Sequence, residues 1–169
     1  PWESADDGTE QCPDWTIEPD GTCYRCYVAV YEHHVTAAVA YGICNYIKIT
    51  QDMEFLYSKG AEILTETARF WASRCEYNQA QDRYEINQVT GPDEWHEPVN
   101  NNLYTNYLAR WNLRYVLSLL TAMKEEKTDA YHALVEKTGL TECEMETWRE
   151  VQAKMYLPRK EGTKLLEQF

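Results

Sequence analysis

The segment from about Leu103 to Glu126 carries the longest regular pattern in the chain, with apolar residues at intervals of three and four. These residues are Leu108, Trp111, Tyr115, Leu119 and Met123. Because an α-helix turns once every 3.6 residues, this spacing places their side chains on one helical face. The pattern predicts one long helix, and a chain that contains it is expected to be mainly helical.

Further segments are also predicted to be helical. They are residues 31–49, 52–59, 60–77, 129–137 and 142–154. Asp52 is the expected N-cap of the segment that it opens, and Gly139 the expected stop of residues 129–137. Thr141 and Glu144 form a capping box for the last helix. The predicted buried stripe of residues 60–77 comprises Ile63, Leu64, Thr67, Ala68, Trp71 and Cys75.

The sequence predicts little β structure. Residues 82–89, "DRYEINQV", alternate polar and apolar side chains, which indicates one short strand. Residues 1–27 are rich in Pro, Gly and Asp and predict a long loop. Residues 155–169 predict a loop with one strand at most. A length of 169 residues favours one domain. The expected fold class is therefore mainly α with one short β element.

Charge and hydropathy exclude two classes of partner. The chain has 16 basic and 28 acidic residues, a net charge of -12, and such a field repels nucleic-acid backbones. No apolar run approaches the ~18 residues of a membrane span. The first residues, "PWESADDGTEQ", show neither an initiator Met nor a signal pattern. We interpret the chain as the middle of a longer cytoplasmic protein.

The six cysteines are too sparse for a disulfide scaffold. Cys44 and Cys75 lie within helical apolar patterns, where cysteine is usually a small buried hydrophobe. Cys23 and Cys26, with Cys12 upstream and the His33–His34 pair downstream, could be zinc ligands. Only one close pair exists, however, and the other spacings fit no common zinc site. We therefore predict reduced thiols and no metal.

Residues 87–107, "NQVTGPDEWHEPVNNNLYTNY", concentrate acidic, aromatic and amide side chains. A loop glutamate beside Trp95 could be partly desolvated and stay protonated near neutral pH, as cleavage of a glycosidic bond requires. Trp95 and the tyrosines could offer flat surfaces to sugar rings. Asn100, Asn101 and Asn102 could bond sugar hydroxyls. The alternative is a solvated acidic loop, which composition alone favours.

The order of several motifs favours the active-site interpretation of residues 87–107 over the solvated loop. "PWESA", "RFWASRCEY", "DRYEIN", "TGPDEWHE" and "NNNLYTNYLARWNL" together resemble the glycoside hydrolase family 65 phosphorylases. The resemblance runs from Pro1 to about Leu120, and it continues weakly through "KMYLP" and "EQF". It implies an (α/α)6 helical barrel, of which residues 1–169 would be a central part, in an enzyme that cleaves α-glucosides with inorganic phosphate.

The resemblance also implies roles for individual residues. It assigns Glu94, in the GPDE motif, as the general acid of an inverting reaction that gives β-glucose 1-phosphate. The matching sugar contacts are Trp2, Glu3, His34, Thr36, Trp95 and His96. His96 follows the pattern of maltose- and kojibiose-type members, although it could equally stabilise the loop. Asp93 is expected to support the loop by local hydrogen bonds.

The match leaves gaps at both ends and one departure within it. The family's phosphate-binding segment lies beyond "EQF", and a Trp–Asp sugar contact lies before "PWES". Ala38 stands where many relatives carry an acid. Phosphate is the only co-substrate expected, with no cofactor. A partial barrel would leave apolar helix faces uncovered, so we expect homo-oligomers and a catalytically silent isolated chain.

Two alternatives remain. An inverting hydrolase of the trehalose type would need a second carboxylate as base, roughly 6.5–9.5 Å from the acid. Phosphate is already anionic, so a phosphorylase needs no such base. A non-catalytic helical module that binds sugar or zinc is the second alternative.

Overall fold

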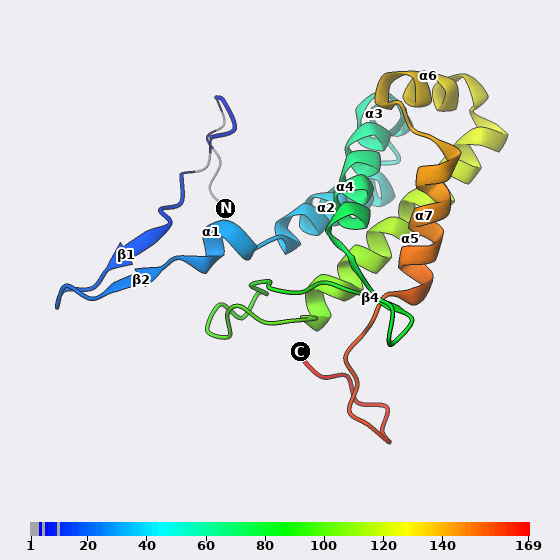
Figure 1. The fold of residues 1–169 in the computed structure, drawn as a ribbon. Coiled ribbons are helices and arrows are strands. Elements are labelled where there is room, and N and C mark those ends of the chain that lie inside the picture. Colours follow the sequence, from blue (N-terminus) through cyan, green and yellow to red (C-terminus); the bar gives the residue numbers. More distant parts are fainter. Residues whose placement is uncertain (1–3, 5, 10) are drawn as a thin grey trace.

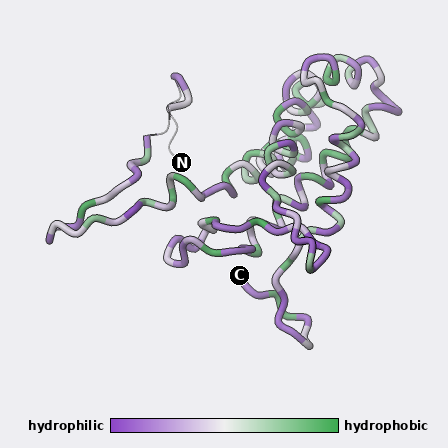
Figure 2. The backbone as a smooth tube through the Cα atoms, viewed as in Figure 1, coloured by the Kyte–Doolittle hydropathy of each residue, from purple (hydrophilic) through white to green (hydrophobic). Residues whose placement is uncertain are grey.

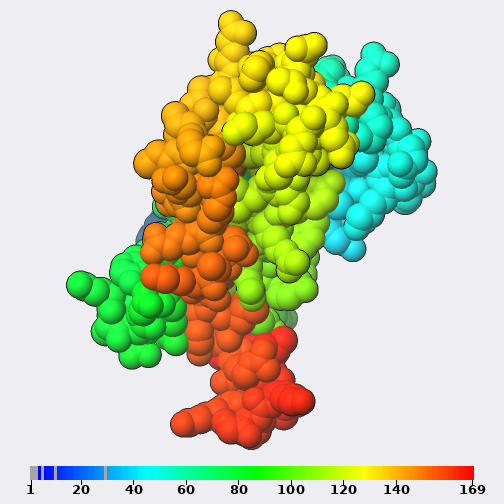
Figure 3. Space-filling view, turned by 90° about the vertical axis from the view of Figure 1, so that its right-hand side faces the viewer, coloured from blue at the N-terminus to red at the C-terminus, as the bar shows by residue number. Residues whose placement is uncertain are grey.

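The computed structural model describes residues 4, 6–9 and 11–169, and the fold is mostly helical, as predicted (Figure 1). Helices α2 (His34–Thr50), α4 (Ala61–Arg74) and α7 (Glu142–Lys154) each contact the central helix α5 (Leu103–Glu126). Helix α6 (Thr128–Thr138) crosses one end of this group, next to α5 (Figure 3). The long helix expected from about Leu103 to Glu126 is confirmed.

The buried face of α5 is wider than its sequence pattern suggests. Of the predicted stripe only Met123 is fully buried, and Leu108, Trp111, Tyr115 and Leu119 are half-buried. The fully buried face is displaced by about one residue and includes Ala109, Leu113, Val116 and Leu120. The helix contacts α2 and α4 as well as α7, so both stripes meet neighbours. In α4, Leu64, Thr67, Ala68 and Trp71 are buried as predicted, but Ile63 is exposed.

Local signals set most of the helix ends. Asp52 accepts a hydrogen bond from Phe55 N and caps α3 (Met53–Phe55). A π-helical turn, Leu56–Gly60, then leads straight into α4, so the two helices predicted over residues 52–77 are joined. Gly139 ends α6 with φ 64°, a left-handed conformation that suits glycine. Thr141 and Glu144 form the predicted capping box of α7.

The described residues contain more β structure than predicted. Strands β1 (Trp15–Ile17) and β2 (Cys23–Arg25) form an antiparallel hairpin within residues 1–27, where only a loop was expected. A second hairpin pairs β3 (Glu76–Asn78) with β4 (Arg83–Glu85), which is the centre of the predicted strand. The prediction of a single β element was therefore wrong.

The segments that connect the helices, and those at the two ends of the chain, are less regular. A short helix, α1 (Tyr27–Tyr31), precedes α2, so the predicted helix over 31–49 begins three residues later. The β1–β2 hairpin extends away from the helices, and the loop between β4 and α5 lies near the chain's C-terminal end (Figure 1). Residues after α7 return to β4, where Met155 pairs with Tyr84.

Polar and apolar residues are distributed unevenly over this structure. Hydrophilic and hydrophobic residues alternate along the helices (Figure 2). The exposed face of α2 nevertheless carries Val35, Val39 and Ile49, the last of them 83% exposed, which agrees with the expected uncovered helix faces. None of the described helices is both long and apolar enough to cross a membrane.

Candidate active site

The acidic loop, residues 90–98, is closed at its base by backbone pairing. Val89 and Val99 each donate their N–H to the other's carbonyl, both at 2.9 Å. Just outside this pair, Asn101 N donates to the carbonyl of Ile86 at 2.8 Å. Within the loop, the Thr90 hydroxyl donates to Glu97 Oε2 at 3.1 Å. Residues 90–98 therefore project from a fixed base.

The asparagines that follow the loop bind the chain itself. Asn100 Oδ1 accepts from Gln88 N at 2.9 Å, and Asn101 Oδ1 accepts from Ile86 N at 3.2 Å. Asn102 Oδ1 accepts from Thr105 N and caps α5. Asn101 and Asn102 are also buried. The expected role as sugar-bonding groups is wrong for Asn101 and Asn102, because both are buried and their side-chain oxygens bond the chain itself. The exposed Asn100 stays a predicted sugar contact.

Asp93 organises the tip of the loop. Its Oδ2 accepts hydrogen bonds from Gln168 Nε2 and His96 Nδ1, each at 2.7 Å, and its Oδ1 accepts from Trp95 N at 3.2 Å. The bonds from Gln168 and His96 hold the pKa of the Asp93 carboxyl below its ordinary value. Asp93 is thus an ionised acceptor, as expected of a loop-supporting residue. His96 serves the same support, and its ring also lies against Phe169.

Glu94 has a different environment. Within the described part of the chain, no hydrogen bond or ion pair engages its carboxylate, and the side chain is exposed. Trp95 is 94% exposed, so the expected desolvation of Glu94 by this ring is wrong for the chain as it stands. The acidic loop extends from the main group of helices toward the side on which the β1–β2 hairpin lies (Figure 1). The two neighbouring acids therefore differ in their environment. The carboxylate of Asp93 is held by hydrogen bonds, whereas that of Glu94 is open to a ligand.

Glu94 lines an open cleft of about 950 Å³ between the acidic loop and the β1–β2 hairpin. The loop contributes Glu94, Trp95 and Glu97, and the hairpin side contributes Trp15, Glu18, Tyr24, Arg25 and their neighbours. Sequence reasoning missed the hairpin wall. The signal was present, because "WTIEPDGTCYR" places Pro-Asp-Gly between two segments rich in β-forming residues.

The remaining predicted site residues lie at the start of α2 or outside the described residues. His34 Nδ1 is 3.4 Å from the Thr90 carbonyl, and its ring packs edge-on against Tyr104. Thr36, in the first turn of α2, is half-buried. Trp2 and Glu3 fall outside the described residues. The structure thus brings His34 to the base of the acidic loop but leaves two predicted contacts unplaced.

The candidate zinc ligands do not gather into one site. Cys12 Sγ lies 3.6 Å from Cys26 Sγ, while Cys23 is exposed on β2. Among the residues with described positions, no group of three or more His, Cys, Asp or Glu side chains is arranged to hold a metal ion. Cys44 is buried as predicted, and burial raises the pKa of the half-buried Cys75 thiol to about 12.

Comparison with known proteins defines the class of this fold and site. The whole chain, residues 1–169, matches the glycosyl hydrolase family 65 central catalytic domain. A solved protein from the human microbiome, provisionally named as a kojibiose phosphorylase, superposes with a TM-score of 0.70 at 34% identity, over 79% of this chain and 17% of its own. The chain therefore belongs to glycosyl hydrolase family 65.

Two curated relatives show which members of the family the chain is similar to. Kojibiose phosphorylase from Caldanaerobacter subterraneus is 50% identical over the whole chain, and 1,2-alpha-glucosylglycerol phosphorylase from Bacillus selenitireducens is 36% identical over 99% of it. The chain spans 22% of the length of each relative. Both relatives are named as phosphorylases.

Proposed function

We propose that residues 1–169 are the central part of an (α/α)6-barrel catalytic domain in a longer, inverting disaccharide phosphorylase. The enzyme would cleave an α-linked glucose disaccharide with inorganic phosphate, giving β-glucose 1-phosphate and a sugar. Kojibiose is the first substrate to test, because the kojibiose phosphorylase is 50% identical and the glucosylglycerol phosphorylase 36% identical. We also propose that the enzyme is cytoplasmic and forms homo-oligomers. The exposed apolar face of α2 offers a surface for this self-association.

Glu94 is the proposed general acid, and its open carboxylate in the cleft is the observation that carries this assignment. Cleavage of the glycosidic bond leaves electron density on the departing oxygen, which must receive a proton. Asp93 cannot serve easily, because three donors stabilise its ionised form. Inorganic phosphate supplies an anionic nucleophile and requires no second carboxylate as base.

The proposed sugar contacts are those that the family motifs imply. Trp95 lines the cleft together with Glu94, while His34 and Thr36 lie in the first turn of α2, with His34 at the base of the acidic loop. Trp2, Glu3 and His96 complete the proposed set by their place in the family motifs. No cofactor is proposed beyond phosphate as co-substrate. Binding the sugar would also cover Trp95 and Glu94, which removes water from the acid and strengthens its interactions.

An inverting hydrolase is the second candidate, because Glu18 and Glu97 line the same cleft as Glu94. The discriminating experiment incubates the complete enzyme with kojibiose, maltose, nigerose and trehalose, with and without phosphate. Phosphorolysis predicts β-glucose 1-phosphate, identified by its anomeric NMR signal, only when phosphate is present. Free glucose released at full rate without phosphate would favour hydrolysis, and binding of sugar with no turnover of any substrate would favour a binding module.

The isolated 169-residue chain provides a separate test. Holding both reactants in reacting geometry contributes ~7–11 kcal/mol in favourable cases, and the proposed phosphate site lies outside this chain. We expect the purified chain to be helical, self-associating and inactive in the same assay, with its mass measured by light scattering. Phosphorolysis by a monomer of this chain would contradict the proposal that residues beyond it are required.

A further inference from the structure

Arg74, the last residue of α4, connects two segments that are distant in the sequence. Its Nε donates to Nδ1 of His33 at 3.1 Å, next to the start of α2. Its Nη2 donates to the carbonyl of Asn87 and, at 3.4 Å, approaches that of Gln88. Its Nη1 pairs with Glu76 at 3.1 Å. The Arg74 side chain is only 19% exposed, so these bonds are largely shielded from water.

The bond to His33 also fixes the state of that ring. A guanidinium group has donors only, so Nδ1 of His33 must accept with its lone pair. The ring proton then lies on Nε2, which donates to the Val30 carbonyl at 3.0 Å. Burial and the charge of Arg74 both lower the pKa of His33, which favours this neutral form. With Phe70 packed edge-on against it, the ring is a fixed connector.

The other partners of Arg74 lead directly into the acidic loop. Thr90, which follows them, donates its N–H to the carbonyl of Tyr31 at 3.0 Å. The carbonyl of Thr90 lies 3.4 Å from Nδ1 of His34. Residues 87–90 are therefore attached at several points to residues 31–34, which join α1 to α2, and Arg74 contacts both of these segments. Glu94 lies four residues beyond Thr90, and His34 follows the anchored His33.

We propose that Arg74 is a positioning residue for the reaction, one that holds His34 and Glu94 in a common orientation toward the substrate without touching the substrate. The proposal rests on the proposed function for its catalytic consequence. It depends on the planar fork of the guanidinium, which donates in several directions at once. A lysine keeps the positive charge but presents donors from a single atom, so it cannot reproduce the bridge.

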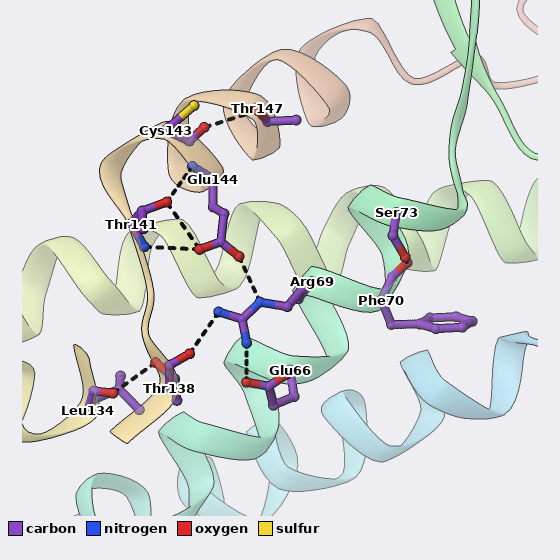
Figure 4. Close-up of polar contacts among 10 residues, drawn as sticks. All are labelled: Glu66, Arg69, Phe70, Ser73, Leu134, Thr138, Thr141, Cys143, Glu144 and Thr147. Atoms are coloured by element: carbon purple, nitrogen blue, oxygen red, sulfur yellow. Dashed lines mark hydrogen bonds and ion pairs between the residues drawn. The ribbon is translucent and has the colours of Figure 1, made fainter. Parts of the chain in front are cut away.

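The same helix supplies a matched control. Arg69 also bridges distant segments, bonding Glu144 at 2.7 Å, the Thr138 carbonyl at 3.2 Å and Glu66 (Figure 4). These partners belong to α4 itself and to the α6–α7 region, and none is in the acidic loop. Arg69→Lys therefore removes a comparable bridge from the same helix while leaving the anchor at residues 87–90 in place.

The test compares Arg74→Lys, Arg69→Lys and wild type in the complete enzyme. Phosphorolysis kinetics and hydrogen exchange of a peptide covering residues 86–91 are measured on each. Displacement of a catalytic group by about 1 Å can cost ~100-fold, so we expect kcat of Arg74→Lys to fall by about 10- to 100-fold. KM should rise less than kcat falls, since His34 is only one of several proposed sugar contacts. The 86–91 peptide should exchange faster in Arg74→Lys alone.

Each other outcome has a defined meaning. An Arg74→Lys enzyme with the kcat of an active wild type overturns the proposal, as does an equal loss of kcat in Arg69→Lys. If wild type cleaves none of the disaccharides, the proposed function fails and hydrogen exchange alone decides the anchoring role. Faster exchange at 86–91 then supports the anchor, and unchanged exchange overturns it.

Discussion

The packed helices and the acidic loop are held in their conformations by different interactions. In the helices, large side chains such as Trp71 and Trp148 are buried almost completely. In the loop, Trp95 is 94% exposed, and order comes from hydrogen bonds at the base and around Asp93. Apolar burial contributes much to stability but leaves no chemical group free, whereas the loop keeps Glu94 available. Stability and reactivity are therefore expected to separate under mutation.

The largest expected effect falls on the reaction. Glu94→Gln keeps the shape of the side chain but removes its acidic proton, so kcat for an unactivated disaccharide should fall by roughly 10²–10⁴. Substrate binding and the thermal midpoint should stay near wild type. The matched control is Glu125→Gln, an exposed glutamate at the far end of α5, which should keep full activity. Near-normal turnover by Glu94→Gln would contradict the general-acid assignment.

Two tryptophans test the comparison directly. Trp148→Ala removes a ring that is 1% exposed in the core, and the free energy of unfolding should decrease by about 3–5 kcal/mol. Trp95→Ala removes a ring at the loop tip, and the same quantity should change by less than ~0.5 kcal/mol. Chemical denaturation of the 169-residue chain measures both. A large loss of stability in Trp95→Ala would show that the loop tip packs against the protein after all.

Substitution of two glycines compares the base of the acidic loop with the interior of a helix. A Cβ atom at Gly91 would lie 2.4 Å from Nδ2 of Asn102, whose buried side chain caps α5. Gly91→Ala should therefore lower the free energy of unfolding by ~1–3 kcal/mol. Gly42, inside α2, has no atom within 4 Å of the added Cβ, and Gly42→Ala should stabilise the chain by ~0.5–1 kcal/mol. Equal effects of the two substitutions would remove the distinction.

The smallest effect concerns acid pH. Partners lower the pKa of Asp93 in the loop and of Glu144 at the start of α7, from ordinary values of 3.8 and 4.5. A carboxyl whose folded pKa is depressed contributes stability above its ordinary pKa and loses it as pH falls through the folded value. Both anchors should thus stay intact from pH 7 to about 5.

NMR signals of the donors can follow these two carboxyls. The side-chain amide of Gln168 should shift only when the pH falls below the ordinary value for Asp93, and Nε of Arg69 only below that for Glu144. In Asp93→Asn the Gln168 signal should no longer move in this range. A shift of the Gln168 signal already near pH 6 would show that Asp93 is not held as described.

Features that depend on residues close together in the chain could be predicted from the sequence. The extent of α5, the capping box at Thr141 and the stop at Gly139 followed from local spacing, because helices are built from contacts three and four residues apart. Ordered motifs predicted the family, which is confirmed, and they support the proposal of Glu94 as general acid. The hairpin around Pro19-Asp20-Gly21 is also encoded locally, by residues that favour a tight turn.

Which polar side chains stay free for a ligand depends instead on how distant parts of the chain pack together. Asn101 turns inward to Ile86, and Arg74 joins His33 to residues 87 and 88, across separations that no local pattern reports. Asp93 and Glu94 are adjacent acids in one loop, yet Gln168 and His96 engage one of them, while the other faces the cleft. A side chain's role in a site depends on partners brought together from distant parts of the chain, and their positions are fixed only when the helices pack.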